Sequence, residues 1–370
     1  MRPIINKTTI LNRWMLTLLL PAMLPWFACV KTYSTATDRS LTPQQPAQSL
    51  LDYLKNNYSF SMFYAAIQRV GLDKQLEDST KKYTILMPDD NAFALANITM
   101  DSLMNADTAY LRKWMGFHII QGAIGYDSVP QTVDNVFYSI LGQKIFLSKP
   151  VTPTQSGQPV LHVNGTAVVS FDIAASDGYI QVLSTPLNAP LEGTLQDYIN
   201  AHPDQYSLFK AALQHFNLWD SLGTDTTRPL TVFAPVNGAF QNLLLLNIAD
   251  NYNYDPYTIT TDTIASWNTN TIPRDVFGVY LFPGRIFTSD FSDAPRTALY
   301  IMPDQQATID FSSQNPTQLT GSLINYAAEQ QLMQGEYGVS VPAPIGSPAN
   351  FVTLNGNCVF QPVGALTMVP

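Results

Sequence analysis

The stretch Tyr83–Phe93, YTILMPDDNAF, returns later in the chain as Leu230–Phe240, LTVFAPVNGAF. Aligned without a gap, the two stretches share a threonine, a proline and an Ala-Phe pair at a constant offset of 147 residues (230 − 83). Matches at a fixed offset indicate a duplicated unit. The chain has 370 residues, and at roughly 150 residues a domain this length also predicts two domains.

Both copies predict the same local structure. A short apolar run is typical of a buried strand, and a proline ends it. An Asp or Asn follows, which is a residue type that caps the N-terminus of a helix, and a Phe then falls in the first helical turn, facing the core. The structural residues of the motif are Pro88, Asp90, Phe93, Pro235, Asn237 and Phe240.

The second copy resembles the first signature of the fasciclin domain family, usually read as TVFAPTNxAF, and the first copy is similar to it. The segment LRKWMGFHIIQG at 111–122 resembles the family's second signature, a helix leading into a strand read as YHVVPG. Phe117 and His118 stand at the family's Tyr-His pair, whereas the second copy has Val279 and Tyr280 there.

This resemblance covers about residues 49–370 and implies an α+β fold. It predicts two fasciclin-like domains, each a β-sandwich-like wedge flanked by helices, at 49–190 and 191–370. Apolar residues at helical spacing precede the motif in both halves, and we expect Gly71 and Asn217 to end the second helix of each.

Tight turns punctuate the closing part of each half. Asn164-Gly165 lies between two apolar runs and predicts a two-residue hairpin. Asp177-Gly178 precedes YIQVL, which resembles the family's closing strand, and Asn355-Gly356 before Cys358 is its expected counterpart.

The second half is longer between its two signatures, which predicts an insertion at about 250–268. It is polar and rich in aromatic residues, and we consider it a candidate partner-binding surface. Its alternative is a solvated loop whose rings pack back on the domain. The candidate partner-binding residues are Phe117, His118, Tyr252, Tyr254, Tyr257 and Trp267.

The amino terminus is expected to be a targeting signal. Residues 1–28 hold three basic residues and an apolar stretch too short to span a bilayer, and they end at Ala28 before Cys29. This resembles the lipobox of bacterial lipoproteins, with Cys29 as the lipid attachment site, and the alternative is an ordinary signal peptide. Residues 29–48 are polar and predict a flexible tether. The expected location is the bacterial cell envelope, lipid-anchored in the outer membrane.

Composition argues against nucleic-acid binding and against a reactive thiol. The net charge is −9 and charged residues make up 13% of the chain, so we expect no nucleic-acid partner. Cys358 is the only cysteine besides Cys29, and its apolar run predicts a buried, unreactive thiol.

The sequence contains no catalytic or ligand-binding motif with a clear mechanism. Its four histidines are scattered, and no phosphate loop or nucleophile elbow occurs. We therefore expect no metal, no cofactor and no enzyme activity. For His118, two readings stand: adhesion at the Tyr-His strand, or a hydrogen bond inside a half-buried strand.

The leading hypothesis is an adhesion or interaction protein that binds a protein or glycan ligand at the cell surface. The first alternative is a surface glycan-binding protein that uses the aromatic insertion, because sugars often stack on exposed rings. The second is an unrecognised hydrolase, since two carboxylates need only meet in space.

Overall fold

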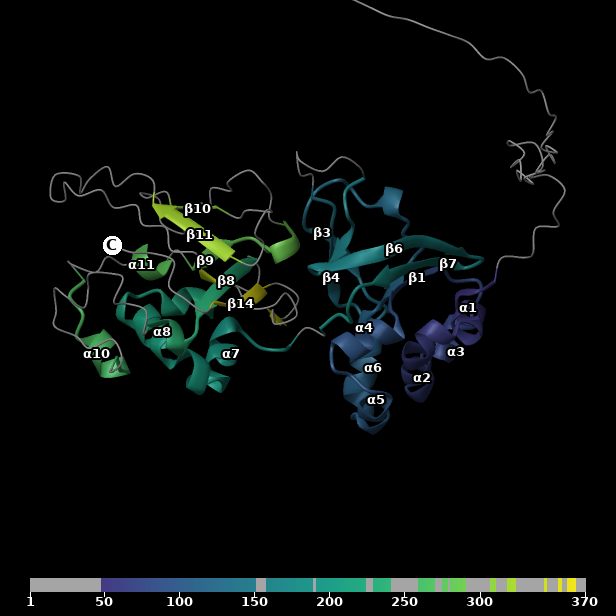
Figure 1. Cartoon of the computed structure of the whole chain (residues 1–370), viewed down its shortest axis with the longest axis horizontal. Coiled ribbons are helices and arrows are strands. Elements are labelled where there is room, and N and C mark those ends of the chain that lie inside the picture. The colour runs from purple at the N-terminus through teal and green to yellow at the C-terminus, as the bar shows by residue number, and fades with distance from the viewer. Residues whose placement is uncertain are drawn as a thin grey trace, which may run out of the picture. The chain divides into compact units, whose positions relative to one another are not determined.

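The computed structural model describes most of the chain between residues 48 and 290 and five short strands beyond it (Figure 1). The described residues are 48–150, 158–188, 191–223, 229–240, 259–269, 275–278, 280–290, 307–310, 318–323, 343–344, 352–354 and 358–363. They belong to one compact unit, Pro46–Pro370. Below, domain 1 denotes the elements up to Leu183 and domain 2 those from Leu195 onward.

Domain 1 is built on a seven-stranded sheet in the order β2-β1-β7-β6-β5-β4-β3. The strands are β1 (Tyr83–Pro88), β2 (Ile119–Gln121), β3 (Asn135–Tyr138), β4 (Lys144–Ser148), β5 (His162–Val163), β6 (Thr166–Ala175) and β7 (Gly178–Leu183). β1 runs parallel to β7, and the other neighbours are antiparallel. An isolated bridge between Ile120 and Ser139 joins the two ends of this order, so the sheet curls back on itself.

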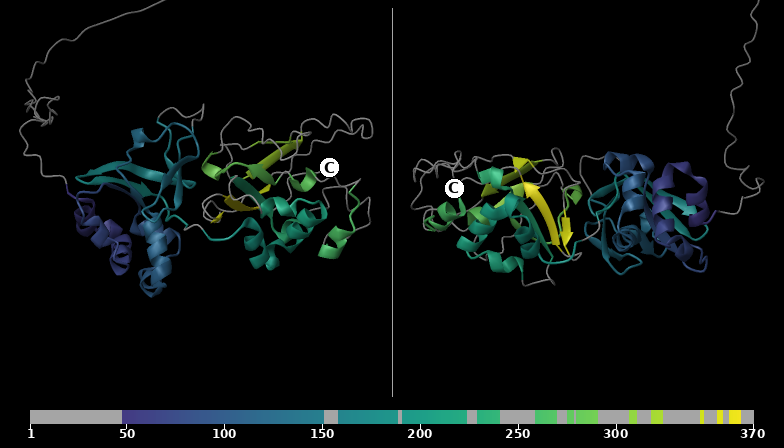
Figure 2. Two further views of the ribbon diagram at one scale, coloured as in Figure 1. Left: turned by 180° about the vertical axis from the view of Figure 1, so that it is seen from behind. Right: turned by 90° about the horizontal axis from the view of Figure 1, so that it is seen from below.

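The helices of domain 1 gather on one face of this sheet (Figures 1 and 2). They are α1 (Leu50–Asn56), α2 (Ser61–Arg69), α3 (Asp73–Leu76), α4 (Asp90–Leu95), α5 (Met100–Asn105) and α6 (Thr108–Phe117), with short 3₁₀ turns η2 (Tyr58–Phe60) and η3 (Tyr126–Ser128). Side chains of these helices form one core with the face of the sheet that they cover.

Every residue of β1 is buried because its two faces serve two different cores. Ile85 and Met87 pack with the helices, whereas Leu86 packs with Leu147 and Val163 from the curled half of the sheet. A strand with both faces covered reads as a continuous apolar run, as the sequence does here. The predicted α+β wedge is therefore confirmed for domain 1.

Domain 2 repeats the central pairing of domain 1. Its four-stranded sheet has the order β13-β14-β8-β9. The strands are β8 (Leu230–Pro235), β9 (Leu281–Pro283), β13 (Val352–Leu354) and β14 (Cys358–Val363). β8 runs parallel to β14 with Leu230 opposite Cys358, just as Tyr83 of β1 lies opposite Gly178 of β7. The predicted closing strand at Cys358 is thus confirmed, while its thiol lies outside the described side chains.

The remaining described elements of domain 2 are helices, 3₁₀ turns and a separate sheet in the order β10-β11-β12. They are α7 (Leu195–Ala201), α8 (Pro203–His215), η4 (Trp219–Leu222), α10 (Thr261–Ala265), α11 (Asp275–Gly278), η7 (Thr288–Asp290), β10 (Ala307–Asp310), β11 (Gln318–Leu323) and β12 (Ala343–Pro344). The helices share a core with β8 and β9 that is distinct from the cores of domain 1.

The predicted ends of the second helix in each half are confirmed. Gly71 and Asn217 have φ angles of +71° and +56°. This left-handed conformation lets the next residue bond back to the helix, as Leu218 N–H does to the carbonyl of Leu213 at 2.7 Å. Asn164 and Gly165, with φ of +45° and +82°, form the predicted hairpin turn between β5 and β6.

The motif helix of domain 1 is capped one residue earlier than predicted. Asp89 accepts the N–H of Ala92 at 2.7 Å and is the N-cap of α4. Asp90 instead accepts the N–H of Met62 at 2.9 Å and the hydroxyl of Ser61 at 2.6 Å, both at the start of α2. Two adjacent aspartates satisfy the same sequence pattern, and only the backbone decides which one caps.

Asn237 has the same role in domain 2, so its prediction as a cap is also wrong. Its Oδ1 accepts the N–H of Leu208 at 3.0 Å, and its Nδ2 donates to the carbonyl of Asp204 at 2.9 Å. Leu208 matches Met62 at an offset of 146 residues (208 − 62). In both domains this motif position ties the end of the central strand to the neighbouring long helix.

Truncation of either motif phenylalanine is expected to destabilise its own domain. Phe93 and Phe240 are both fully buried, so Phe93→Ala and Phe240→Ala should each lower the free energy of unfolding by roughly 3–5 kcal/mol. Urea unfolding of the full chain measures this. Leu95→Ala is the control, because Leu95 in the same helix is 76% exposed. A loss at Phe93 no larger than that at Leu95 would refute its place in the core.

Candidate functional site

The candidate pair Phe117 and His118 lies at the junction of α6 and β2, with both side chains fully buried. The ring of Phe117 packs in the core of the curled half of the sheet, beside Leu86 and Ile120. The imidazole of His118 faces Phe63 of α2, with ring centroids 5.9 Å apart. Neither side chain can contact a partner in this conformation.

His118 holds the chain that leaves domain 1. Its Nδ1 lies 2.9 Å from the carbonyl oxygen of Trp114, and its Nε2 lies 2.9 Å from the backbone nitrogen of Leu187. A carbonyl can only accept and an amide N–H can only donate, so Nδ1 carries the proton and Nε2 accepts. The indole N–H of Trp114 donates to the carbonyl of Leu187 at 2.6 Å. Trp114 of α6 and His118, directly after this helix, therefore hydrogen-bond the backbone carbonyl and the backbone N–H of Leu187.

Burial fixes the imidazole in its neutral form. Loss of hydration lowers the pKa of His118 from 6.5 to about 4, although the hydrogen bond to Trp114 acts in the opposite direction. Protonation of Nε2 would also set two donors, Nε2–H and the N–H of Leu187, against each other. The structure thus accounts for His118 by buried hydrogen bonds.

Domain 2 has Tyr280 at the position that His118 occupies in domain 1. The carbonyls of His118 and Tyr280 accept N–H groups from Leu86 and Phe233 of the two central strands, at 2.8 and 2.9 Å. The ring of Tyr280 packs edge-on against Phe209 at 6.1 Å, as His118 packs against Phe63 of domain 1. The ring position is common to both domains, and the imidazole is specific to domain 1.

Trp267 belongs to an element that both domains possess. The helix α10 opens with a capping box of Thr260 and Thr263, and α5 opens with one of Thr99 and Ser102. The two boxes are offset by 161 residues (260 − 99). The extra length of domain 2 therefore precedes Thr260, and the predicted insertion ends earlier than residue 268.

The prediction of Trp267 as an exposed partner-binding residue is wrong. Its side chain is 4% exposed and stacks on Phe277 at 5.7 Å. Its carbonyl accepts a hydrogen bond from His215 at 2.9 Å, just as the carbonyl of Ala106 accepts one from Arg69 at 2.8 Å. A tryptophan in a polar stretch reads as exposed, but the framework buries this position.

The three tyrosines of the same stretch, Tyr252, Tyr254 and Tyr257, lie outside the described residues. Their role in partner binding stays a prediction. The glycan hypothesis rests on them alone, because Trp267 is not available at the surface.

An exposed apolar surface does occur on domain 1, at residues outside the predicted partner-binding set. β3 ends the strand order of the sheet, and its side chains alternate between half-buried and exposed. Val136 and Tyr138 are 42% and 55% exposed, and Leu141 in the following turn is 40% exposed. We call these three residues the β3 edge surface. The alternation of Asn135–Tyr138 is the signal that could have revealed it.

The described part of the chain offers little for other chemistry. Within it, no group of three or more His, Cys, Asp or Glu side chains is placed to hold a metal ion. Among the same residues, no helix combines the length and the apolar character that crossing a membrane requires.

Comparison with known proteins agrees with the first copy of the motif. A family model described as the fasciclin domain matches residues 58–189, a range that contains β1, His118 and β7. These residues of the chain form a fasciclin domain. Fasciclin domains are linked to cell adhesion and interaction, and their family members are generally non-enzymatic.

Two known proteins are similar to this chain. The pig (Sus scrofa) transforming growth factor-beta-induced protein ig-h3 is 28% identical over 153 residues, which are 41% of this chain and 21% of the pig protein. The chain thus matches about a fifth of that relative's length. A solved FAS1 domain pair from the insect cell adhesion molecule fasciclin I has 15% identity and a TM-score of 0.34, with 84% of this chain and 97% of that one covered.

The buried imidazole of the fasciclin domain predicts a pH-dependent stability. The unfolded chain takes up a proton at His118 near pH 6.5, but the folded protein does so only near pH 4. Stability from this residue therefore falls as the pH is lowered, by about 2 kcal/mol between about pH 7 and about pH 5. His118→Gln cannot titrate, and its loss over that interval should be smaller by the same amount.

Urea unfolding of the full chain at the two pH values measures this difference. Trp114→Phe is the control, because it removes the other hydrogen bond to Leu187 but keeps the imidazole. It should lower stability equally at both pH values. An unchanged pH dependence in His118→Gln would contradict the neutral, buried state of this residue.

Proposed function

We propose that this chain is a lipid-anchored, exported adhesion or interaction protein of the bacterial cell envelope, without enzymatic activity. The observation that carries the proposal is the fasciclin domain at 58–189 together with the apolar β3 edge surface that it exposes. A fasciclin domain supplies a framework for binding, and members of this family are generally non-enzymatic.

The amino-terminal sequence supports the anchor. A short apolar stretch stops at Ala28-Cys29, and the polar residues 30–48 separate Cys29 from α1. Acylation of one cysteine with several chains would hold the protein firmly, because each buried methylene contributes about 0.8 kcal/mol. The tether would keep the domains clear of the membrane surface. The anchor is expected in the outer membrane.

The β3 edge surface is the proposed contact site for a partner at the cell surface. The bridge to Ile120 engages Ser139, directly after β3, and among the described residues β4 is the only strand that pairs with β3 itself. The outer side of such a strand offers backbone groups to an added strand. Val136 and Tyr138 point the same way from this strand, two residues apart, and could fill pockets on a partner. This chemistry fits an extended, apolar segment of a protein ligand.

Replacement of the anchor cysteine should release the protein. Cys29→Ala is expected to move the chain from the membrane fraction to the soluble fraction without unfolding it, because the domains begin beyond the tether. Labelling of cells with a fatty-acid probe, followed by fractionation, measures this. If the Cys29→Ala protein still incorporated the label, Cys29 would not be the site of attachment.

A charge on the edge strand should weaken adhesion. Val136→Lys is expected to reduce attachment of cells that display the full chain about tenfold, equivalent to about 1.4 kcal/mol, because a lysine on an edge strand opposes strand addition. Val169→Lys is the matched control, since Val169 is 63% exposed but lies on β6, between β5 and β7. Equal attachment by the two variants would exclude the β3 edge.

A further inference from the structure

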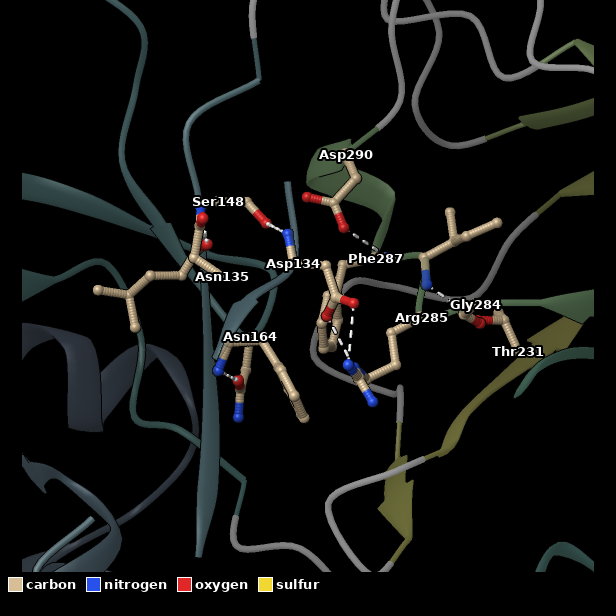
Figure 3. A network of polar contacts seen from close by, with 12 residues as sticks. Asp134, Asn135, Ser148, Asn164, Thr231, Gly284, Arg285, Phe287 and Asp290 are labelled. Atoms are coloured by element: carbon tan, nitrogen blue, oxygen red, sulfur yellow. Dashed lines mark hydrogen bonds and ion pairs between the residues drawn. The ribbon is translucent and has the colours of Figure 1, made fainter. Parts of the chain in front are cut away.

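An ion pair links residues from the two fasciclin domains. Arg285 follows β9 of domain 2, and Asp134 directly precedes β3 of domain 1. The guanidinium donates through Nε to Oδ1 of Asp134 at 2.7 Å and through its Nη2 to Oδ2 at 2.9 Å (Figure 3). The side chains are 9% and 27% exposed. Two parallel, shielded hydrogen bonds between charged groups are stronger and more directional than an exposed pair.

Aromatic rings surround the ion pair. The guanidinium of Arg285 lies over the ring of Phe146, 4.1 Å from its centroid. Phe146 of domain 1 and Phe287 of domain 2 are 1% and 2% exposed, and they form an apolar cluster of their own, separate from the cores of both domains. The charge is therefore held in a setting from which water is largely removed.

The hairpin turn of domain 1 is shaped to admit Phe287. A Cβ atom at Gly165 would lie 3.2 Å from Cβ of Phe287, which is tighter than ordinary contact. On the opposite side, the N–H of Phe287 is held by Oδ2 of the buried Asp290 at 3.0 Å. Asp134 has a φ of +61°, and its N–H donates to the hydroxyl of Ser148 at 3.1 Å. Both partners are preorganised by bonds within their own domains.

The two domains can be compared at this loop because a shared clamp aligns it. The hydroxyl of Thr84 donates to the carbonyl of Gly122 at 2.8 Å and accepts the N–H of Ile124 at 2.7 Å. Thr231 does the same to Gly284 and Ile286, at 2.7 and 2.9 Å. Positions 122 and 284 are therefore equivalent, as are positions 124 and 286.

The alignment shows that the contact residues are not demanded by the fold. Arg285 occupies the position of Ala123, and Phe287 the position of Gly125. Domain 1 builds the same clamp with these two small residues. The two domains thus share the same loop geometry, but only domain 2 has an arginine and a phenylalanine in it. Both Arg285 and Phe287 contact domain 1.

We propose that Arg285 and Phe287 form a docking site through which domain 2 binds the acidic and aromatic surface of domain 1 made by Asp134, Phe146 and Gly165. The interface, rather than the connecting segment, couples the two fasciclin domains, and they act as one binding body. The proposal does not depend on the anchor or on the ligand of the β3 edge surface.

The test is hydrogen–deuterium exchange of the full chain in which Arg285→Ala is compared with the unmodified protein. This substitution installs the residue that domain 1 has at the same position, so the loop is expected to keep its fold. Exchange should become about tenfold faster both in 280–290 and, across the interface, in 134–148. Acceleration confined to 280–290 would overturn the proposal, because it would show that loss of the Arg285 side chain does not change the stability of segment 134–148 in domain 1.

Two further variants make the result specific. Asp134→Asn keeps a residue type that tolerates the left-handed turn but removes the charge, and the double variant Asp134→Asn/Arg285→Ala should exchange no faster than Arg285→Ala alone. Additive effects would overturn the pairing. Lys113→Ala is the matched control, because its ion pair with Glu192 is also 2.7 Å long, but Glu192 is 85% exposed. It should leave exchange in both segments unchanged.

Discussion

The parallel pairing of a central strand with the last strand of its domain is the constraint on which each of the two domains depends. β1 pairs with β7, and β8 pairs with β14, in the same register over six residues. Two parallel neighbours need a long crossover between them, so the other strands of each sheet lie between these two strands in sequence, while the first helices of each domain precede the central strand. The position of Gly178 illustrates how close this pairing is, because a Cβ there would overlap the carbonyl oxygen of Tyr83.

Side-chain hydrogen bonds around the two parallel strands explain why the motif has polar residues among apolar ones. Thr84 and Thr231 hold the loop after the second signature, and Asp90 and Asn237 hold the long helix. Each of these side chains hydrogen-bonds to backbone atoms, so its partial or full burial does not carry the cost of a lost hydrogen bond. His118 extends the same scheme to the segment that leaves domain 1. These residues are structural, which is why the signatures identify the fold more securely than they identify a ligand.

The sequence predicts the structural features that depend on neighbouring residues, but it does not predict contacts between residues far apart in the chain. The duplication, the buried strand, the hairpin at Asn164-Gly165 and the closing strand at Cys358 all follow from residues adjacent in the chain. Trp267 did not, because its burial depends on a core assembled from distant helices. The pair of Arg285 and Asp134 is separated by 151 residues, and no local pattern predicts it. The β3 edge surface was missed because its alternation is only four residues long.

Because the chain contains two copies of the domain, residues that the fold requires can be distinguished from residues that serve one domain alone, without any other sequence. Positions that play one role in both domains, such as the clamps, report what the fold needs. Positions that differ within the same clamp, as Arg285 does from Ala123, report what one domain has gained. A long cation is costly to hold out of water unless it is paired, so its presence on a loop that folds equally well with alanine argues for a specific partner. Asp134 and the ring of Phe146 supply that partner, and the same comparison shows why domain 1, with Ala123 and Gly125 in its own loop, receives this contact but does not make it.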